Sequence, residues 1–217
     1  CTHSEHLYGE FWHRAFTVAA DTPHAELVLS FGYNGDASGG VTGVWRHAEA
    51  RARGLEWVQF EPHQSITAAG ATEWVPIRPK TDAAFLFALI HVLLHETPRE
   101  ALDLDFLYRH TSSPYLVGEH GYYVRDPMHA QPIVAASLEA TETQLGLEIG
   151  PDGDVLDEGL LAGVTAFGKL VEHMRRYTPE WAETVCDVPA ATMRRIAHEY
   201  AAAACVGQTI EIEGKTL

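Results

Sequence analysis

The feature that most constrains the fold of this chain is a strand, a helix and a second strand near its amino end. Residues 25–32, AELVLSFG, form an apolar run that ends in glycine, a pattern typical of a buried parallel strand. Residues 41–53 have the pattern of a helix closed by Gly54, and a second apolar strand, LEWVQFEP, follows at 55–62. The second strand begins about thirty residues after the first, which is the spacing of a βαβ unit, so the sequence predicts a parallel sheet.

The alternation continues through the stretch WVPIRPKTDAAFLFALIHVLLHE. Residues 73–77 predict a third strand, and residues 82–95 predict a nearly all-apolar helix that Pro98 helps to end. We therefore expect an α/β fold, with a Rossmann-like parallel sheet and flanking helices, over about the first hundred residues.

The rest of the chain divides by composition. We expect residues 1–110 to be an α/β dinucleotide-binding region and 111–170 an irregular excursion rich in turn residues, with a solvated loop at 150–159, GPDGDVLDEG. Residues 171–217 are expected to return as a C-terminal helical part of the same domain, followed by a short strand at 209–212.

Two helices are predicted near the carboxyl end. Thr178 can cap the first, with Pro179 at its first position, and Pro189 opens the second. Three residues of the second helix are spaced to lie on one face: Met193, Ile196 and Tyr200. A tight turn between short helices also suggests helix-turn-helix DNA binding, but the acidity of the chain argues against it.

Composition excludes several classes of protein. A net charge of -15 over 217 residues disfavours nucleic acid or an anionic membrane as a partner. The apolar run at residues 83–94 is shorter than the roughly 20 residues that cross a bilayer, so we expect no direct membrane insertion. The three cysteines include no CxxC pair for zinc or an iron-sulfur cluster. The chain begins with Cys and ends in EIEGKTL, from which we expect a piece of a longer polypeptide.

Parallel sheets bind ligands at the carboxyl ends of their strands, so we look for function in the loops there. After the first strand, Gly32 allows close approach to a ligand and Asn34 can bind a phosphate or a base. After the second strand come Glu61, Pro62 and His63, and an acidic residue at this position commonly binds ribose hydroxyls. The simpler interpretation of Gly32 and Asn34 is a turn.

A third loop carries Lys80, Thr81 and Asp82, and a carboxylate there can accept hydrogen bonds from guanine. From spacing alone, Asp82 is better explained as a helix N-cap. The glycines of GYNGDASGG do not have GxGxxG spacing, which disfavours a standard NAD pyrophosphate loop.

Metal and hydrolase sites are less well supported. His91 and His95 are spaced i and i+4, but the segment lacks the glutamate of HExxH. A second set near the amino end matches no tetrahedral template: Cys1, His3, His6 and His13. The chain has no GxSxG nucleophile elbow.

Three segments together resemble a known family: FEPHQSITAAGATEWVP, EWVPIRPKTDAAFLFALIHVLLHE and, far downstream, YTPEWAETVCDVPAATMRRIAHEYA. They resemble the catalytic subunits of molybdopterin oxidoreductases related to dimethyl sulfoxide reductase, and the likeness runs from Cys1 to the last helix. It implies an α/β domain that holds the guanosine end of one pyranopterin in a bis(molybdopterin guanine dinucleotide) cofactor with molybdenum or tungsten.

The resemblance also implies roles for individual residues, by position. It implies that Gly32, Tyr33 and Asn34 contact the dinucleotide and that Glu61, Pro62 and His63 contact its ribose. It implies that Lys80, Thr81 and Asp82 contact its guanine, and that Cys1 lies near the cofactor without ligating the metal. The chain departs from the family, which often has Asp and Arg where Glu61 and His63 stand and usually has Gly where Lys80 stands.

The family's chemistry belongs to the whole enzyme, in which the metal performs redox or oxygen-atom transfer and electrons leave through iron-sulfur clusters. The resemblance therefore implies an oxidoreductase whose iron-sulfur cluster lies elsewhere in the parent chain. It also implies two partners, namely an iron-sulfur electron-transfer subunit and the remaining domains of the same catalytic subunit. The excursion resembles members that act on sulfur oxyanions, arsenate or arylacetyl-thioesters. Two alternatives remain: a nicotinamide-dependent dehydrogenase domain with Glu61 on the ribose, and a catalytically silent scaffold subunit.

Overall fold

The computed structural model divides after Pro79 into two compact units. It describes residues 20–118, 120–126, 128–138, 142–149, 155–162, 164–212 and 214–216. Cys1 and the neighbouring histidines of the candidate metal set therefore lie outside the described residues. The expected division at residues 110 and 170 stays a prediction.

A parallel sheet forms the centre of the first unit. Its strands are β1 (Leu27–Phe31), β2 (Glu56–Phe60) and β3 (Glu73–Val75), in the order β1-β2-β3. Phe31 pairs with Phe60, and Phe60 with Val75, so all three strands end at one edge of the sheet. The predicted α/β fold with a parallel sheet is confirmed.

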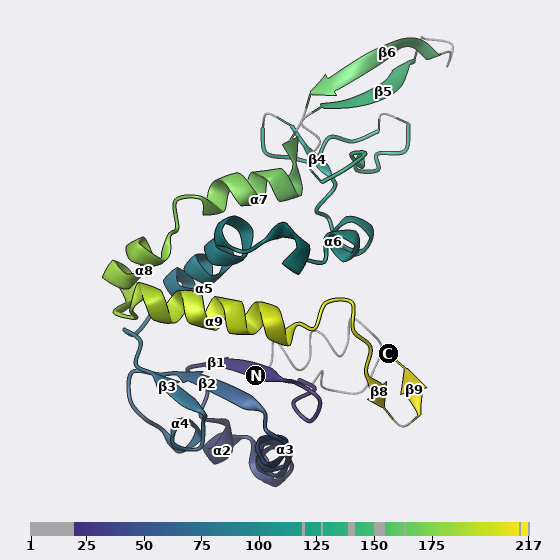
Figure 1. Cartoon of the computed structure of the whole chain (residues 1–217). Coiled ribbons are helices and arrows are strands. Elements are labelled where there is room, and N and C mark those ends of the chain that lie inside the picture. The colour runs from purple at the N-terminus through teal and green to yellow at the C-terminus, as the bar shows by residue number, and fades with distance from the viewer. Residues whose placement is uncertain are drawn as a thin grey trace. The chain divides into compact units, whose positions relative to one another are not determined.

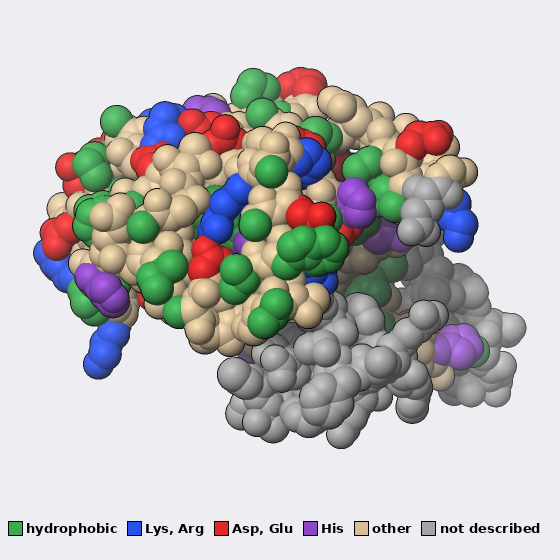
Figure 2. All heavy atoms as spheres, turned by 90° about the horizontal axis from the view of Figure 1, so that it is seen from below, with side chains coloured by type: hydrophobic (Ala, Val, Ile, Leu, Met, Phe, Trp, Pro, Cys, Tyr) green, Lys and Arg blue, Asp and Glu red, His purple; other side chains and the backbone are tan. Residues whose placement is uncertain are grey.

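Three helices lie on one face of this sheet: α2 (Gly35–Ser38), α3 (Gly40–Arg53) and α4 (Ile66–Ala69) (Figure 1). The helix α3 ends as predicted, because Gly54 adopts the left-handed conformation with φ of 107° and its N–H caps the last turn. Ala50 of α3 packs against Leu55 and Trp57 in a buried cluster. Figure 2 shows the molecule from below. Over the described residues in this view, hydrophobic side chains are scattered among acidic and basic ones.

The second unit is mainly helical. Its first helix, α5 (Asp82–His91), continues into a π-helical turn, η2 (Val92–Glu96), and contacts α7 (Ala166–Met174), α8 (Pro179–Cys186) and α9 (Ala190–Ala203). The π turn is closed by Thr97, whose N–H donates to the Val92 carbonyl at 2.9 Å. Among the residues described, every helix is too short or too polar to span a bilayer.

The two carboxyl-terminal helices begin as predicted. The Thr178 hydroxyl accepts a hydrogen bond from the Trp181 N–H at 3.2 Å, and Pro179 is the first residue of α8. Met193 and Ile196 of α9 are fully buried, but Tyr200 is 46% exposed. The predicted apolar face is therefore wrong at Tyr200, because the residue lies in the last turn, beyond the packed part of the helix.

The excursion contains more regular structure than the sequence suggested. Its strands are β4 (Leu116–Val117), β5 (Glu142–Ile149), β6 (Val155–Ala162) and β7 (Val164–Thr165). Two short helices precede it, η3 (Arg99–Ala101) and α6 (Leu104–His110), and the chain's last strands are β8 (Glu211–Ile212) and β9 (Lys215–Thr216). Because β5 and β6 pair as an antiparallel hairpin, the loop expected at 150–159 is wrong from residue 155 onward. The turn residues of GPDGD at 150–154, between the two strands, concealed the start of β6 in the sequence.

Candidate functional site

The carboxyl edge of the sheet carries the first two candidate loops. Directly after β1, Gly32 has φ of +57°, a conformation that favours glycine, and its N–H donates to the Phe60 carbonyl at 3.0 Å. A Cβ atom added at Gly32 would meet no atom of the described residues within 4 Å. Glycine here sets the turn and leaves the backbone open to close approach.

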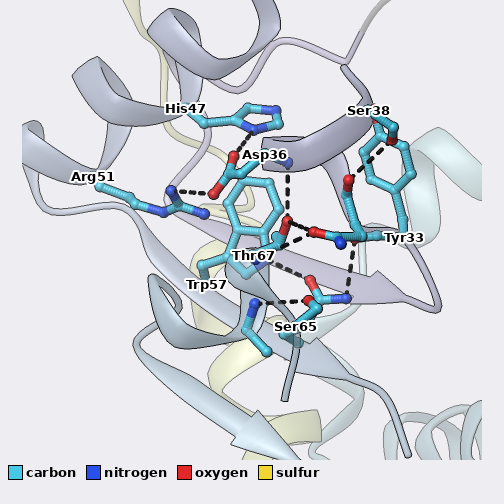
Figure 3. Close-up of polar contacts among 11 residues, drawn as sticks. Tyr33, Asp36, Ser38, His47, Arg51, Trp57, Ser65 and Thr67 are labelled. Carbon is cyan, nitrogen blue, oxygen red and sulfur yellow. Dashed lines mark hydrogen bonds and ion pairs between the residues drawn. The ribbon is translucent and has the colours of Figure 1, made fainter. Parts of the chain in front are cut away.

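The next residues of this loop are held to the start of α4. The Oδ1 atom of Asn34 accepts hydrogen bonds from the Thr67 hydroxyl at 3.0 Å and, more weakly, from the Thr67 N–H at 3.4 Å. In turn, the Thr67 hydroxyl accepts a bond from the Asp36 N–H at 2.9 Å (Figure 3). The oxygen of Asn34 is thus used within the protein, and no described residue accepts a hydrogen bond from its amide Nδ2.

A charged cluster, which we call the Asp36 cluster, fixes α2 against α3. One carboxylate oxygen of Asp36 lies 2.8 Å from Nδ1 of His47, and the other accepts a bond from Nη1 of Arg51 at 2.7 Å (Figure 3). Burial alone would raise the pKa of Asp36, but the hydrogen bonds from His47 and Arg51 and the charge of Arg51 outweigh it and lower the pKa below its ordinary 3.8. Asp36 is therefore an ionised structural residue.

Close packing supports the same cluster. The guanidinium carbon of Arg51 lies 4.8 Å from the centroid of the Trp57 ring, and the His47 ring meets that indole edge-on at 4.8 Å. A Cβ atom at Gly35 would lie 2.5 Å from the Tyr33 ring and 3.1 Å from the His47 ring. Glycine at this position lets the loop pack on α3, which explains one glycine of the YNGD segment without a phosphate.

A second polar group, the Gln59 row, runs along one face of β2 and consists of Trp57, Gln59 and Glu61. The indole Nε1 of Trp57 donates to Oε1 of Gln59 at 3.0 Å, and Nε2 of Gln59 donates to Oε1 of Glu61 at 2.9 Å. Residues i, i+2 and i+4 of a strand share a face, which is why these side chains meet. Glu61 is only 4% exposed, and its Oε2 is buried without a hydrogen-bond partner among the described residues.

The backbone of Glu61 continues the sheet. Its N–H donates to the Val75 carbonyl at 3.3 Å, and its carbonyl accepts a bond from the Trp74 indole at 3.0 Å. The next two residues, Pro62 and His63, are exposed. The structure thus separates the three loop residues carried over from the resemblance into one buried carboxylate and two surface residues.

The third candidate loop belongs to the second unit and is described by itself. Lys80 is exposed and has φ of 67°, a left-handed conformation that costs roughly 1 kcal/mol for a residue with a side chain. Thr81 is the N-cap position of α5, and Asp82 is its first helical residue, so the N-cap interpretation of Asp82 is wrong by one position. A carboxylate in the first turn is favoured by the helix dipole.

The histidine pair is not arranged as a metal site. Nδ1 of His91 lies 2.9 Å from the Met174 carbonyl, and Nε2 of His95 lies 2.9 Å from the Val171 carbonyl. Their rings are 4.8 Å apart and tie α5 and the π turn to α7. Over the part of the chain that the structure describes, no group of three or more metal-ligating side chains gathers.

Sequence reasoning missed several residues at the sheet edge: Asp36, His47, Arg51, Gln59 and Thr67. One signal was available, since a glutamine inside the apolar strand EWVQF requires buried hydrogen-bond partners. The other contacts depend on how α3 and α4 are placed on the sheet, which local sequence does not specify.

Comparison with known proteins gives a consistent picture. No family model matches the chain. A sulfite dehydrogenase subunit of Allochromatium vinosum is 31% identical over 176 residues, covering 70% of this chain and 17% of the relative. The thiosulfate reductase molybdopterin-containing subunit PhsA of Salmonella typhimurium is 26% identical, covering 86% of this chain and 17% of the relative. The chain thus spans about a sixth of the length of these relatives.

A solved structure supports the fold. Acetylene hydratase from Pelobacter acetylenicus matches with a TM-score of 0.52 and 18% sequence identity, over 82% of this chain and 17% of that chain. Escherichia coli proteins named dimethyl sulfoxide reductase DmsA and formate dehydrogenase-O major subunit also match, at 27% and 26% identity.

Proposed function

Because the chain belongs to the dimethyl sulfoxide reductase superfamily of molybdopterin oxidoreductases, we propose that it holds a pterin guanine dinucleotide in the catalytic subunit of such an enzyme. One observation carries the proposal: the buried Oε2 of Glu61, at the carboxyl end of a parallel strand, accepts no hydrogen bond from the described residues. An acidic side chain at this position is the usual partner of ribose hydroxyls.

The residues of the sheet edge fit such a ligand. Among the described residues nothing obstructs a Cβ position at Gly32, nothing accepts from Nδ2 of Asn34, and Oε2 of Glu61 is an acceptor without a donor. We assign the dinucleotide to Gly32, Tyr33 and Asn34, and its ribose to Glu61 with the exposed Pro62 and His63. The role of Cys1 near the cofactor stays a prediction.

In the second unit we assign the guanine to Lys80, Thr81 and Asp82. The carboxylate of Asp82 accepts hydrogen bonds and matches the N–H donors of guanine, while Lys80 presents an exposed cation. The bound group would be a bis(molybdopterin guanine dinucleotide) with molybdenum or tungsten, and it supplies the redox chemistry. The residues of this chain bind and orient it.

We further propose that the parent enzyme acts on a sulfur oxyanion, because relatives named sulfite dehydrogenase and thiosulfate reductase match the chain over 70% and 86% of its length. Its partners would be an iron-sulfur electron-transfer subunit and the remaining domains of its own polypeptide. Assay of the intact protein with sulfite and thiosulfate, using an artificial electron acceptor or donor, tests the substrate class. Absence of turnover with both would contradict it.

The experiment that tests cofactor binding is analysis of the intact protein for molybdenum, tungsten and released GMP. We expect one of the metals together with GMP, and Asp82→Ala should lower GMP retention. Asp105→Ala is the matched control, because Asp105 is also a first-turn acid of a helix, α6, and should change nothing. Finding neither metal nor GMP would overturn the proposal. NAD in their place would favour a nicotinamide-dependent dehydrogenase, and a retained fold without any nucleotide would favour a scaffold subunit.

A further inference from the structure

Gln59 occupies an unusual place for a polar side chain, because it is completely buried, one residue before the carboxyl end of β2. Its amide is nevertheless well bonded. Oε1 accepts from the Trp57 indole at 3.0 Å, and Nε2 donates to the Tyr33 carbonyl at 3.2 Å and to Oε1 of Glu61 at 2.9 Å. Both amide hydrogens are thus used, one on each of two neighbouring loops.

These bonds fix the Glu61 carboxylate by one of its two oxygens. Oε1 is held by Gln59, while Oε2 is buried and has no donor among the residues described. A buried carboxylate oxygen without a donor is costly, and proteins keep such groups where a ligand completes the bonding. The asymmetry therefore leaves one acceptor in a fixed position for a ligand.

We propose that Gln59 is a positioning residue that aims Oε2 of Glu61 at the ribose diol of a guanine nucleotide and so sets the preference for ribose. The inference rests on the proposed function and deepens it. A hydroxyl suits this acceptor, because it donates one hydrogen bond to a carboxylate without requiring further ligands. The second amide hydrogen, bonded to the Tyr33 carbonyl, keeps the Gln59 side chain from turning away from Glu61.

The role requires the amide of Gln59 rather than its volume. Methionine has a similar shape but would leave the Tyr33 carbonyl and Oε1 of Glu61 without their donor. The Glu61 carboxylate would then be free to rotate between its oxygens. We expect the binding of groups other than the ribose diol to change little.

The test compares GDP with 2′,3′-dideoxy-GDP by isothermal titration calorimetry. The intact protein is produced in a host that makes no pterin dinucleotide, so that the probes are not competed. Wild type should bind GDP about 10-fold to 100-fold more tightly than the dideoxy analogue, the range for a hydrogen bond to a charged group. Gln59→Met should reduce this preference to below about 3-fold and leave the affinity for the dideoxy analogue within about 2-fold of wild type.

Two further variants complete the design. Glu61→Gln keeps the shape of the side chain but removes its charge, and it should lose the ribose preference as well. Gln131→Met makes the Gln59→Met exchange at an exposed position and should behave as wild type.

The outcomes separate the two proposals. If wild type binds neither probe, the proposed function fails and the role of Gln59 fails with it. If wild type prefers GDP and either Gln59→Met or Glu61→Gln keeps the full preference, only the role of Gln59 and Glu61 is overturned. Equal weakening of both probes by Gln59→Met would show a merely structural residue and would also overturn it. If Gln59→Met does not fold, Glu61→Gln still decides whether Oε2 reads the ribose.

Discussion

Two carboxylates of the first unit have opposite surroundings. Asp36 uses both of its oxygens, one with His47 and one with Arg51, whereas only Oε1 of Glu61 has a donor, Gln59, among the described residues. A carboxylate with both oxygens bonded contributes to the folded state, because its desolvation is offset by its partners. One with an oxygen left over costs stability unless a ligand completes it. The comparison thus separates a structural acid from the acid to which we assign the ribose.

The largest effect should come from opening the Asp36 cluster. Asp36→Ala leaves the Arg51 guanidinium without its carboxylate in a part-buried position, and we expect the free energy of opening of β1 and β2 to fall by about 3 kcal/mol. Amide hydrogen exchange of peptides from this sheet in the intact protein measures it, with exchange about 100-fold faster. Asp105→Ala breaks an Asp–Arg contact of the same 2.7 Å length on the surface of α6. It should change the free energy of opening of α6 by under about 1 kcal/mol.

The same variant gives a pH dependence with a definite sign. The pKa of Asp36 is lower in the folded protein than its ordinary 3.8. Its contribution to stability is therefore complete above 3.8 and is lost as the pH falls through the folded pKa. The difference in exchange between wild type and Asp36→Ala should therefore be constant above about pH 5 and shrink below about pH 4. A difference that grows on acidification would contradict the ion-pair account.

How far the sequence predicted these two acids follows from where their partners lie. The apolar strands, the closing Gly54 and the Thr178 cap are local patterns, and each was predicted correctly. Glu61 was named as a candidate because its position at a strand end is also local, and its role stays a prediction. Asp36 was not named as a candidate. Its partners lie eleven and fifteen residues later on a helix, and packing fixes the rotation of that helix on the sheet.

The hairpin β5–β6 and the exposed Tyr200 were missed for related reasons. The turn residues at 150–154 concealed the start of β6, and the last turn of α9 extends past the residues that bury its apolar face. The asymmetry of the Glu61 oxygens also lay beyond the sequence, because it depends on which oxygen Gln59 reaches.

The second effect should have the opposite sign to the first. Glu61→Gln removes a buried charge that lacks one partner, so in protein without ligand we expect opening of β2 to cost about 1 kcal/mol more than in wild type. Exchange of β2 peptides should then be about 5-fold slower. If Glu61→Gln instead accelerates exchange as Asp36→Ala does, Glu61 is a structural acid and the contrast between the two carboxylates disappears.

The smallest effect sharpens the comparison by moving the same chemistry to the surface. Arg194 of α9 binds Glu96 through two nitrogens, at 2.6 and 2.9 Å, and Glu180 of α8 at 2.7 Å. Glu180 is 62% exposed, so water and salt screen the cluster, and Arg194→Met should lower the free energy of opening of α9 by at most about 1 kcal/mol.

Ionic strength and pH distinguish this surface cluster from the Asp36 cluster. The hydrogen bond from Arg194 lowers the pKa of Glu180 from 4.5 to about 2. The contribution of Glu180 to stability is therefore complete above pH 4.5 and is lost as the pH falls toward 2. The Arg194→Met effect, followed by hydrogen exchange, should also decrease between 0.05 and 0.5 M salt, whereas the Asp36→Ala effect should not. Arg175→Met, which breaks an exposed pair with Glu172, is the control. If Arg194→Met lowers the free energy of opening of α9 by more than about 2 kcal/mol and salt does not change this effect, the exposure of a carboxylate does not decide its contribution to stability.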